Sequence, residues 1–256
     1  MVVSGTEIDL LATRLDRAER TVTDTPSLAE DHEFDIEDAY RIQDRLIGLR
    51  LGRGESIVGV KLGFTSKAKM AQMGVSDVIV GRLTDAMRFD DGADVDLSRF
   101  IHPKIEPEIA YRLGRDVDLD DPATDIATCV DAVAPAMEII DSRYRDFRFT
   151  YTDVIADNTS AAGYVIGPWQ RMQEAGNRAV RLEVGATCVV GSTAAILGDP
   201  IKALHALVGM ARHRSIPLCA GQVVLAGAAT AAVTLTATVA RCDVAGLGSV
   251  TVRGRS

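Results

Sequence analysis

The feature that most constrains the fold is a change in hydrophobic period near residue 57. Before it, residues 6–22 and 35–50 carry apolar side chains at helical spacing, with Asp and Arg between them. After it, short runs rich in Val, Ile and Thr show the two-residue period of β-strands. The sequence therefore predicts an α+β protein, with an N-terminal helical cap over 1–55 and a mixed β domain over 56–256.

The predicted strands are spread over the second part of the chain. They cover residues 57–64, 102–113, 132–141, 181–191, 222–227, 232–244 and 249–254. Short helices are expected at 66–73, 124–131 and 200–213. The segment AGLG between the last two strands suits a hairpin. We expect one mixed, curled sheet with helices at its periphery.

Composition limits the class of protein. The 256 residues are 47% hydrophobic but only 5% aromatic, so one sizeable core must be built mainly from Val, Ile, Leu and Ala. A net charge of -8 argues against a nucleic-acid partner, which needs a basic face. No apolar run approaches the ~20 residues that span a membrane, and the N-terminus does not read as a signal peptide. Four widely spaced cysteines suit a reducing cytoplasm, so we expect a cytoplasmic protein without a membrane partner.

Two glutamates in the run PKIEPEIA stand two residues apart. Successive side chains of a strand point to opposite faces, so Glu106 and Glu108 share one face, while Ile105 and Ile109 share the other. Pro107 removes a ladder donor, which predicts an edge position or a bulge for this segment. The spacing alone is equally compatible with the solvent-exposed face of an edge strand.

A third acid, Glu138, lies in the apolar run APAMEIID. It stands between Met137 and Ile139, where a free carboxylate would be costly to bury. Two acids on one face also repel each other unless a cation or solvent compensates. A cation held by Glu106, Glu108 and Glu138 would resolve both costs. Carboxylates are hard oxygen ligands that suit Mg²⁺ or Mn²⁺ rather than zinc.

A lysine, Lys61, interrupts the strand run IVGVKLGF. Its face of the strand otherwise carries Ile57, Gly59 and Gly63, and glycines beside a lysine leave room for a close approach. The opposite face, which includes Leu62, is apolar and faces the core. A surface lysine on a half-exposed strand is the other explanation of this pattern.

Four segments together resemble a known enzyme family: GVKLGFTSKAKMAQMGV, HPKIEPEIAYRLGRD, PAMEIIDSRYRDF and DVIADNTSAAGYVIGP. From about residue 35 to the C-terminus, in order and at family spacing, the chain resembles one branch of the divalent-metal-dependent fumarylacetoacetate hydrolase superfamily. That branch contains the 2-oxopent-4-enoate hydratases and the 2-oxohex-3-enedioate (4-oxalocrotonate) decarboxylases of the meta-cleavage route for degrading aromatic compounds. The resemblance implies a mixed β-roll with a helical N-terminal part.

The resemblance also implies a cofactor and partners. The family's metal ligands fall on Glu106, Glu108 and Glu138, and its active-site lysine falls on Lys61. The implied cofactor is Mg²⁺ or Mn²⁺, with no organic cofactor, because a 2-oxo acid supplies its own electron sink. The implied partners are a small 2-oxo dicarboxylic acid substrate, further copies of the chain in a homo-oligomer, and the hydratase with which family decarboxylases associate.

The same resemblance suggests substrate contacts. The DNxS block puts Ser160 near the substrate, with Asp157 and Asn158 shaping that loop. Ile79 and Leu62 are the other candidates for substrate contact.

Two short segments favour the decarboxylase over the hydratase. Hydratases tend to carry an acidic residue where this chain has Ile79, and Leu-Gly-Pro where it reads GAATAAV over 227–233. An apolar wall at Ile79 suits the loss of CO₂, whereas a hydratase needs a polar group to direct water. The sequence therefore predicts metal-dependent decarboxylation of 2-oxohex-3-enedioate to 2-hydroxypenta-2,4-dienoate and CO₂. The alternative is a 2-oxopent-4-enoate hydratase.

Two further alternatives belong to other classes. An acylpyruvate-type hydrolase would need a general base, usually a His/Glu arrangement in the helical region. His32 lies near Glu30 and Glu33, but no persuasive constellation surrounds it. A non-catalytic metal-binding partner of a true enzyme would show no turnover on 2-oxo acids. Retention of every ligand position argues against it.

Three arginines follow the predicted strand over 132–141. Arg143, Arg145 and Arg148 are expected to form a solvated face or a subunit contact, although one of them could bind a substrate carboxylate. His102, which precedes the strand with the two glutamates, is expected to make a structural hydrogen bond.

Overall fold

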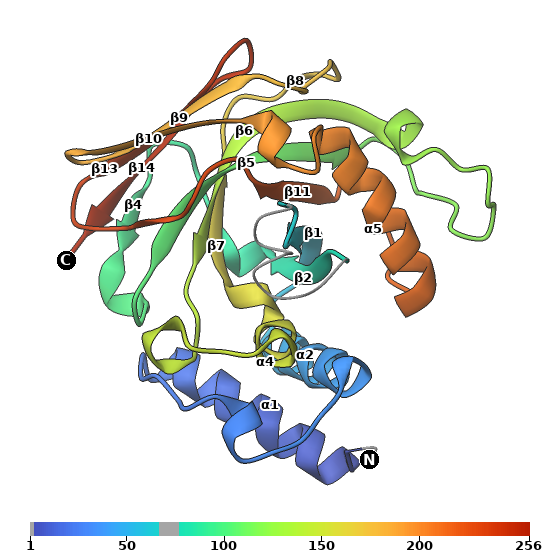
Figure 1. Cartoon of the computed structure of the whole chain (residues 1–256), viewed down its shortest axis with the longest axis vertical. Coiled ribbons are helices and arrows are strands. Elements are labelled where there is room, and N and C mark those ends of the chain that lie inside the picture. The colour runs from blue at the N-terminus through green and yellow to red at the C-terminus, as the bar shows by residue number, and fades with distance from the viewer. Residues whose placement is uncertain (1–2, 67–76) are drawn as a thin grey trace.

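A computed structural model of the chain describes residues 3–66 and 77–256. Its strands form two sheets, of nine and five strands, that lie over one another with helices below and beside them (Figure 1). The expected α+β architecture, with curled mixed sheets and an N-terminal helical layer, is confirmed. The expectation of a single sheet is wrong, because the later strands pair mainly with one another.

The larger sheet contains β1 (Ile57–Gly63), β2 (Ile79–Thr84), β3 (Arg88–Phe89), β5 (Lys104–Leu113), β6 (Val130–Ile140), β7 (Ala161–Ile166), β8 (Gln170–Arg171), β11 (Val223–Ala228) and β12 (Val233–Thr234). Its order is β2-β1-β11-β5-β6-β7-β3, with β12 beside β5 and β8 beside β6. The pairs β1/β11 and β3/β7 are parallel, and the other neighbours are antiparallel. The sheet is therefore mixed, as predicted.

The smaller sheet contains β4 (Asp94–Asp96), β9 (Ala179–Val184), β10 (Thr187–Ser192), β13 (Val239–Val244) and β14 (Gly248–Arg255). Its order is β10-β9-β13-β14-β4. The run predicted as one strand over 181–191 is a hairpin, because Gly185 takes a left-handed conformation with φ 58° that turns the chain. The predicted hairpin between the last two strands is confirmed.

The main hydrophobic core lies between the two sheets. Side-chain alternation sends one face of each strand into it, as with Val133 and Met137 of the larger sheet and Leu182 and Val250 of the smaller sheet, all fully buried. The core consists mainly of Val, Ile, Leu and Ala, as the low aromatic content predicts. The opposite face of the larger sheet carries the polar groups of the candidate site.

The α-helices of the described residues are α1 (Gly5–Arg20), α2 (Ile36–Leu51), α4 (Tyr151–Ala156) and α5 (Pro200–Arg214). The side chains of Ser4, Asp35 and Asp199 accept backbone N–H groups at the starts of α1, α2 and α5. The predicted helices at 6–22, 35–50 and 200–213 are confirmed.

Two other helix predictions have different outcomes. Residues 124–131 contain only the short 3₁₀ turn Ile126–Cys129, because Val130 already pairs in β6. The helix predicted at 66–73 lies almost wholly outside the described residues.

The helical layer consists of α1 and α2 together with α4 from later in the chain. Leu11, Leu15 and Leu46 share one buried cluster with Ile155 of α4. Gln43 fixes this layer to the sheet, since its Nε2 donates to the carbonyls of Val80 at 3.0 Å and of Ile155 at 2.8 Å. The proposed domain boundary at residue 55 stays a prediction.

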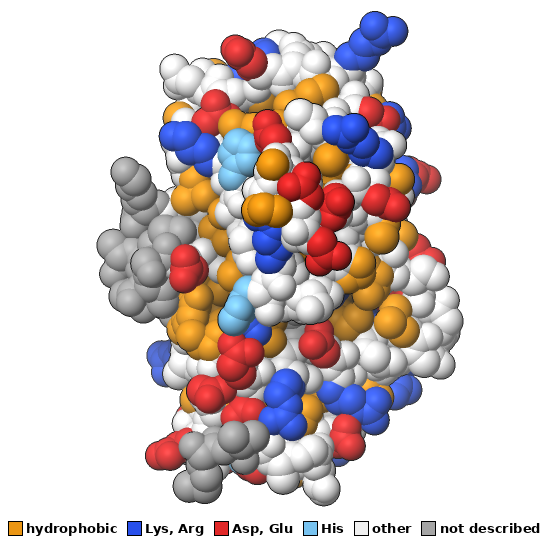
Figure 2. Space-filling model, turned by 90° about the vertical axis from the view of Figure 1, so that its right-hand side faces the viewer, with side chains coloured by type: hydrophobic (Ala, Val, Ile, Leu, Met, Phe, Trp, Pro, Cys, Tyr) orange, Lys and Arg blue, Asp and Glu red, His pale blue; other side chains and the backbone are white. Residues whose placement is uncertain are grey.

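The stretch Thr193–Arg214 is long and apolar enough to cross a membrane by length and composition alone. Most of it is α5, whose residues Leu204, Leu207 and Ala211 are fully buried in the main core. Buried core helices pass the same test, so the stretch is weak evidence for a membrane span. Seen from the α5 side, acidic and basic side chains are interspersed among hydrophobic ones (Figure 2).

Candidate active site

Three buried carboxylates meet on one face of the larger sheet. The antiparallel register of β5 and β6 pairs Glu106 with Glu138, and Glu108 with Ala136, so the three acids share a face. One carboxylate oxygen from each lies within 4.8 Å of the others, and the residues are at most 5% exposed. The predicted shared face is confirmed, and a solvent-exposed strand face is excluded.

The strand with the two glutamates is central, not an edge. It lies between β11 and β6, so the edge explanation of Pro107 is wrong. The predicted bulge lies in the neighbouring strand, where the register shifts by one residue between Leu225 and Ala228. Beyond the bulge, the N–H of Ala229 donates to the Pro107 carbonyl at 2.9 Å. The bulge therefore lets β11 pair with β5 on both sides of Pro107, which has no backbone N–H to donate.

The same bulge directs a backbone donor at the site. Gly227 has φ +119°, and its N–H donates to Oε2 of Glu108. A Cβ at this position would lie 1.9 Å from Oγ1 of Thr65, so only glycine fits. One oxygen of Glu108 is thus fixed by the fold, while Oε1 has no hydrogen-bond partner among the described residues.

The carboxylates form an electrostatically costly group. Burial raises the pKa of Glu108 well above its usual range, and the charges of Glu138 and Glu106 raise it further. Lys61 and the Gly227 N–H act in the opposite direction. Carboxylate oxygens of Glu106, Glu108 and Glu138 lie within 4.8 Å of one another and are the hard donors that a divalent cation prefers, so such an ion fits the donor set.

Lys61 is a buried site residue and not a surface lysine. Its Nζ lies 3.0 Å from Oε2 of Glu138 and donates to the Thr159 carbonyl at 3.1 Å. The residue is 3% exposed. The lysine therefore has a fixed direction, set by one metal-ligand candidate and by one backbone carbonyl.

The Thr159 carbonyl belongs to an unusual loop. Asn158, Thr159 and Ser160 all have left-handed backbones, with φ 48°, 55° and 59°. The Asn158 side chain bonds the backbone of Arg82, accepting its N–H at 2.7 Å and donating to its carbonyl at 2.9 Å. A Cβ at Gly81 would lie 2.3 Å from Oγ1 of Thr159, so that glycine allows the loop to pack against β2.

The three candidates for substrate contact have different positions. Ser160 lies in this loop, and its Oγ has no hydrogen-bond partner within the described part of the chain. Ile79 pairs with Gly63 across β1 and β2, so its side chain lies on the Lys61 face. Leu62 points to the opposite face, into the main core, and the structure does not bring its side chain to the carboxylates.

Sequence reasoning missed Arg143. It was expected on a solvated face or at a subunit contact, but it is 2% exposed and forms an ion pair with Asp157. The two residues are 14 positions apart, so only the fold brings them together. Arg145, in contrast, is exposed as expected and pairs with Asp24 at 3.0 Å.

Within the described part of the chain, His32 and His102 are bonded to groups other than the three carboxylates. Nε2 of His102 lies 2.7 Å from the Ser142 carbonyl, which confirms the expected structural hydrogen bond. Nδ1 of His32 lies 2.9 Å from Oε1 of Glu7 on α1, and α1 is separated from the strands by α2 and α4 (Figure 1). This pair is therefore not placed to act as the base of a hydrolase.

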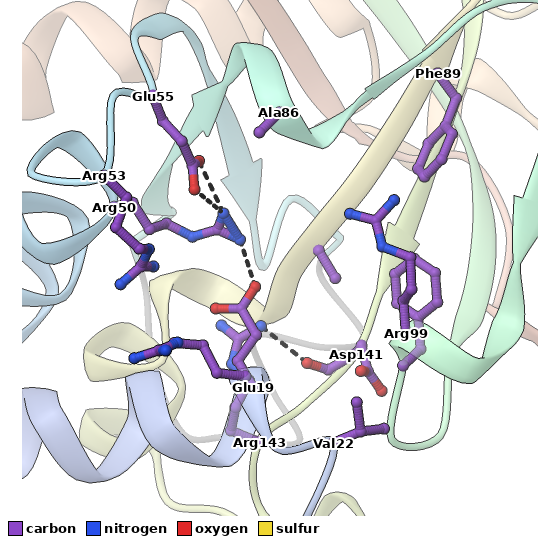
Figure 3. A pocket seen from close by; sticks show the side chains of 13 residues that line it. Glu19, Val22, Arg50, Arg53, Glu55, Ala86, Phe89, Arg99, Asp141 and Arg143 are labelled. Carbon is purple, nitrogen blue, oxygen red and sulfur yellow. Dashed lines mark hydrogen bonds and ion pairs between the residues drawn. The ribbon is translucent and has the colours of Figure 1, made fainter.

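A second charged region is a pocket of about 290 Å³ between the helical layer and the sheet (Figure 3). Arg50 lies at its centre, where it pairs with Glu19 and with Oε2 of Glu55 at 2.9 Å. Arg143 reaches the same pocket and donates to the Asp141 carbonyl at 3.0 Å. Each of these acids and arginines has a protein partner.

Comparison with known proteins agrees with this geometry. A 4-oxalocrotonate decarboxylase of Pseudomonas sp is 47% identical, over 95% of this chain and 96% of that protein. Another, from Pseudomonas putida, is 37% identical over 87% of each. A 2-keto-4-pentenoate hydratase of Paraburkholderia xenovorans (strain LB400) is 34% identical, over 85% of this chain and 83% of that protein. No protein-family model matches the chain.

Solved structures give the same result. The 4-oxalocrotonate decarboxylase from Pseudomonas putida G7, complexed with magnesium and adipate, superposes with a TM-score of 0.92, 33% identity and 99% coverage of both chains. The fumarylpyruvate hydrolase of Pseudomonas aeruginosa shares the fold alone, with a TM-score of 0.59, 15% identity and coverage of 76% of this chain and 88% of that chain.

The fold is of the fumarylacetoacetate hydrolase-like structural class, and its larger sheet carries the carboxylate site. Within that class, the chain belongs to the family of the 4-oxalocrotonate decarboxylases and the related 2-keto-4-pentenoate hydratases.

Proposed function

We propose that this protein is a carboxy-lyase that converts 2-oxohex-3-enedioate to 2-hydroxypenta-2,4-dienoate and CO₂. The observation that carries the proposal is the buried group of three carboxylates within 4.8 Å, with the Lys61 ammonium 3.0 Å from one of them. The 47% identical decarboxylase supports the reaction type. The neighbour that binds adipate supports a six-carbon dicarboxylic acid as the substrate.

Glu106, Glu108 and Glu138 would hold Mg²⁺ or Mn²⁺. The hard oxygen donors, their burial and the unpartnered Oε1 of Glu108 all fit such an ion. When bound, the cation supplies Lewis acidity and positive charge for a 2-oxo acid. The Gly227 N–H keeps Glu108 oriented for this task.

Lys61, Ser160 and Ile79 have separate roles toward the substrate. Lys61 stabilises the negative charge that develops on the substrate's 2-oxo oxygen as the carbon–carbon bond to the distal carboxylate breaks and the bond electrons move along the conjugated chain. The oxygen then takes up a proton from solvent, which gives the hydroxyl group of the product. Its two partners, Glu138 and the Thr159 carbonyl, restrict the ammonium to one direction. The Ser160 hydroxyl would donate to a substrate oxygen, and Ile79 would form an apolar wall that excludes water.

The hydratase is the competing reaction, because several relatives at 34% identity carry that name. Ile79 opposes it, since this buried apolar side chain cannot direct a water molecule at an alkene. A hydrolase is disfavoured by the position of the His32–Glu7 pair.

The deciding experiment offers both substrates to the purified, Mn²⁺-loaded protein. CO₂ release from 2-oxohex-3-enedioate should exceed hydration of 2-hydroxypenta-2,4-dienoate by at least about 100-fold in kcat/KM, a differential barrier of about 3 kcal/mol. Glu108→Gln, prepared identically, controls for contaminating enzymes. Water addition as the main reaction would overturn the assignment in favour of the hydratase, and no turnover of either acid would favour a non-catalytic partner.

The assembly and the location of the protein are parts of the same proposal. We infer a cytoplasmic homo-oligomer that associates with the hydratase consuming its product, as the family resemblance implies. Light scattering after gel filtration, alone and with that hydratase, measures both associations. A monomeric mass at micromolar concentration would contradict the first, and separate elution would contradict the second.

A further inference from the structure

The buried guanidinium of Arg143 is enclosed by backbone carbonyls. Nη1 donates to the carbonyls of Asp141 at 3.0 Å and Ala161 at 3.1 Å, and Nη2 donates to the carbonyl of Asp157. Nε forms the ion pair with the Asp157 carboxylate, whose other oxygen accepts the Arg143 N–H at 3.1 Å. The side chain therefore joins the end of β6 to both ends of the loop 157–161.

This loop needs such a support. Three successive non-glycine residues, Asn158 to Ser160, have left-handed backbones, a conformation that L-residues adopt at an energetic cost. Burial raises the pKa of Asp157 to about 7, against the lowering effect of the guanidinium. Arg143 is thus the group that favours the charged form of Asp157 in this apolar setting.

The loop in turn directs the candidate catalytic lysine. Its Thr159 carbonyl accepts a hydrogen bond from Nζ of Lys61 at 3.1 Å, and its next residue is Ser160. Among the described residues, Lys61 also forms an ion pair with Glu138, which belongs to the carboxylate group. The conformation of the loop therefore decides whether the ammonium has a fixed acceptor outside that group.

We propose that Arg143 is a positioning residue, whose planar fork holds the loop 157–161 in the conformation that directs Lys61 at the substrate. The inference rests on the proposed function, because it assumes that Lys61 acts in catalysis. Arg143 touches neither Lys61 nor the carboxylates in any contact of the described residues, so it acts through Thr159. A lysine at this position would keep the charge but could not bind three carbonyls with fork geometry.

A double-mutant cycle on kcat tests this role in the full-length, Mn²⁺-loaded protein. Arg143→Lys should lower kcat by about 10- to 100-fold, because small misplacement of a catalytic group has effects of that size. KM and the Mn²⁺ dissociation constant should change less than about twofold. In the Lys61→Ala background, the same substitution should change kcat by less than about twofold, because its effect passes through the missing lysine.

Matched variants separate positioning from loss of folding. Arg145→Ala removes an exposed arginine from the same segment and should leave kcat unchanged. Asp157→Asn keeps the size of the side chain but removes its charge, and should repeat the pattern of Arg143→Lys more weakly. If Arg143→Lys does not fold, Asp157→Asn takes its place in the cycle.

The outcomes distinguish the positioning role of Arg143 from the catalytic role of Lys61. An effect of Arg143→Lys on kcat that vanishes in the Lys61→Ala background supports the inference. If Arg143→Lys lowers kcat by the same factor in the Lys61→Ala background as in the wild type, and Lys61→Ala is itself strongly impaired, the positioning role is overturned and the proposed function stays intact. An unimpaired Lys61→Ala overturns the assumed role of the lysine, and the inference with it.

Discussion

The carboxylate group on the larger sheet and the arginine-lined pocket beside the helical layer (Figure 3) both bury several charges, but they compensate them differently. In the pocket, Arg50 lies between Glu19 and Glu55, and Thr84 Oγ1 donates to Glu55 at 2.6 Å. In the carboxylate group, three acids converge, and within the described part of the chain the Lys61 ammonium lies 3.0 Å from one of them. In the pocket, Glu19 and Glu55 each have an arginine partner, whereas the carboxylate group brings three like charges within 4.8 Å of one another.

The difference teaches how to separate a structural charge cluster from a functional one. Both contain arginine or lysine beside acids, and the pocket is the more obvious hollow. Of the two regions, the carboxylate group is the one that combines three buried acids close together with an acid whose pKa is raised by its neighbours. Convergence of buried like charges therefore indicates a cation site better than the shape of a cavity does.

Removal of the divalent cation should have the largest effect. We expect exhaustive chelation with EDTA to lower decarboxylase activity by at least about 1,000-fold, and added Mg²⁺ or Mn²⁺ to restore it, because the carboxylates hold the required Lewis acid. Steady-state kinetics before and after metal addition measure this. Full activity in the chelated, metal-free protein would show that the carboxylate group, like the arginine-lined pocket, needs no bound cation.

Lys61→Ala should have the next largest effect. We expect kcat to fall by about 100- to 1,000-fold with Mn²⁺ still bound, because charge stabilisation is lost while the three ligands remain. Kinetics together with a calorimetric Mn²⁺ titration check both parts. Unchanged kinetics would show that the buried lysine only balances Glu138, as Arg50 balances Glu19 in the pocket.

Arg50→Met should lower the free energy of unfolding by about 1–3 kcal/mol, because it leaves two partly buried acids without their partner. Since the pocket is predicted to have no catalytic part, kcat and KM should stay within about twofold of the wild type. Urea unfolding and steady-state kinetics on the same preparation measure the two quantities. A large loss of kcat at unchanged stability would contradict a structural role.

Glu108→Gln should produce the smallest stability change, and one of opposite sign. In the metal-free protein we expect it to raise the free energy of unfolding by about 1 kcal/mol, because it removes one of several repelling buried charges. Urea unfolding with and without Mn²⁺ provides the measurement. Destabilisation of the metal-free protein by this variant would mean that the carboxylates are already compensated, as the acids of the pocket are.

Much of the architecture follows from local sequence patterns. The change of period near residue 57 separates helices from strands, and Asp35 and Asp199 mark helix starts. These features depend on residues a few positions apart, so they can be predicted. The number of sheets could not be predicted, since it depends on which of many similar strands pair.

The same division holds for the site. The two-residue spacing of Glu106 and Glu108 determined that they share a face, because side chains alternate in any strand. Only the tertiary structure decided that Glu138 joins them, that Lys61 is buried against Glu138, and that Arg143 lies beneath the loop 157–161. Those contacts join segments 14 to 77 positions apart, and strand register and loop packing, which no local pattern encodes, bring them within bonding distance.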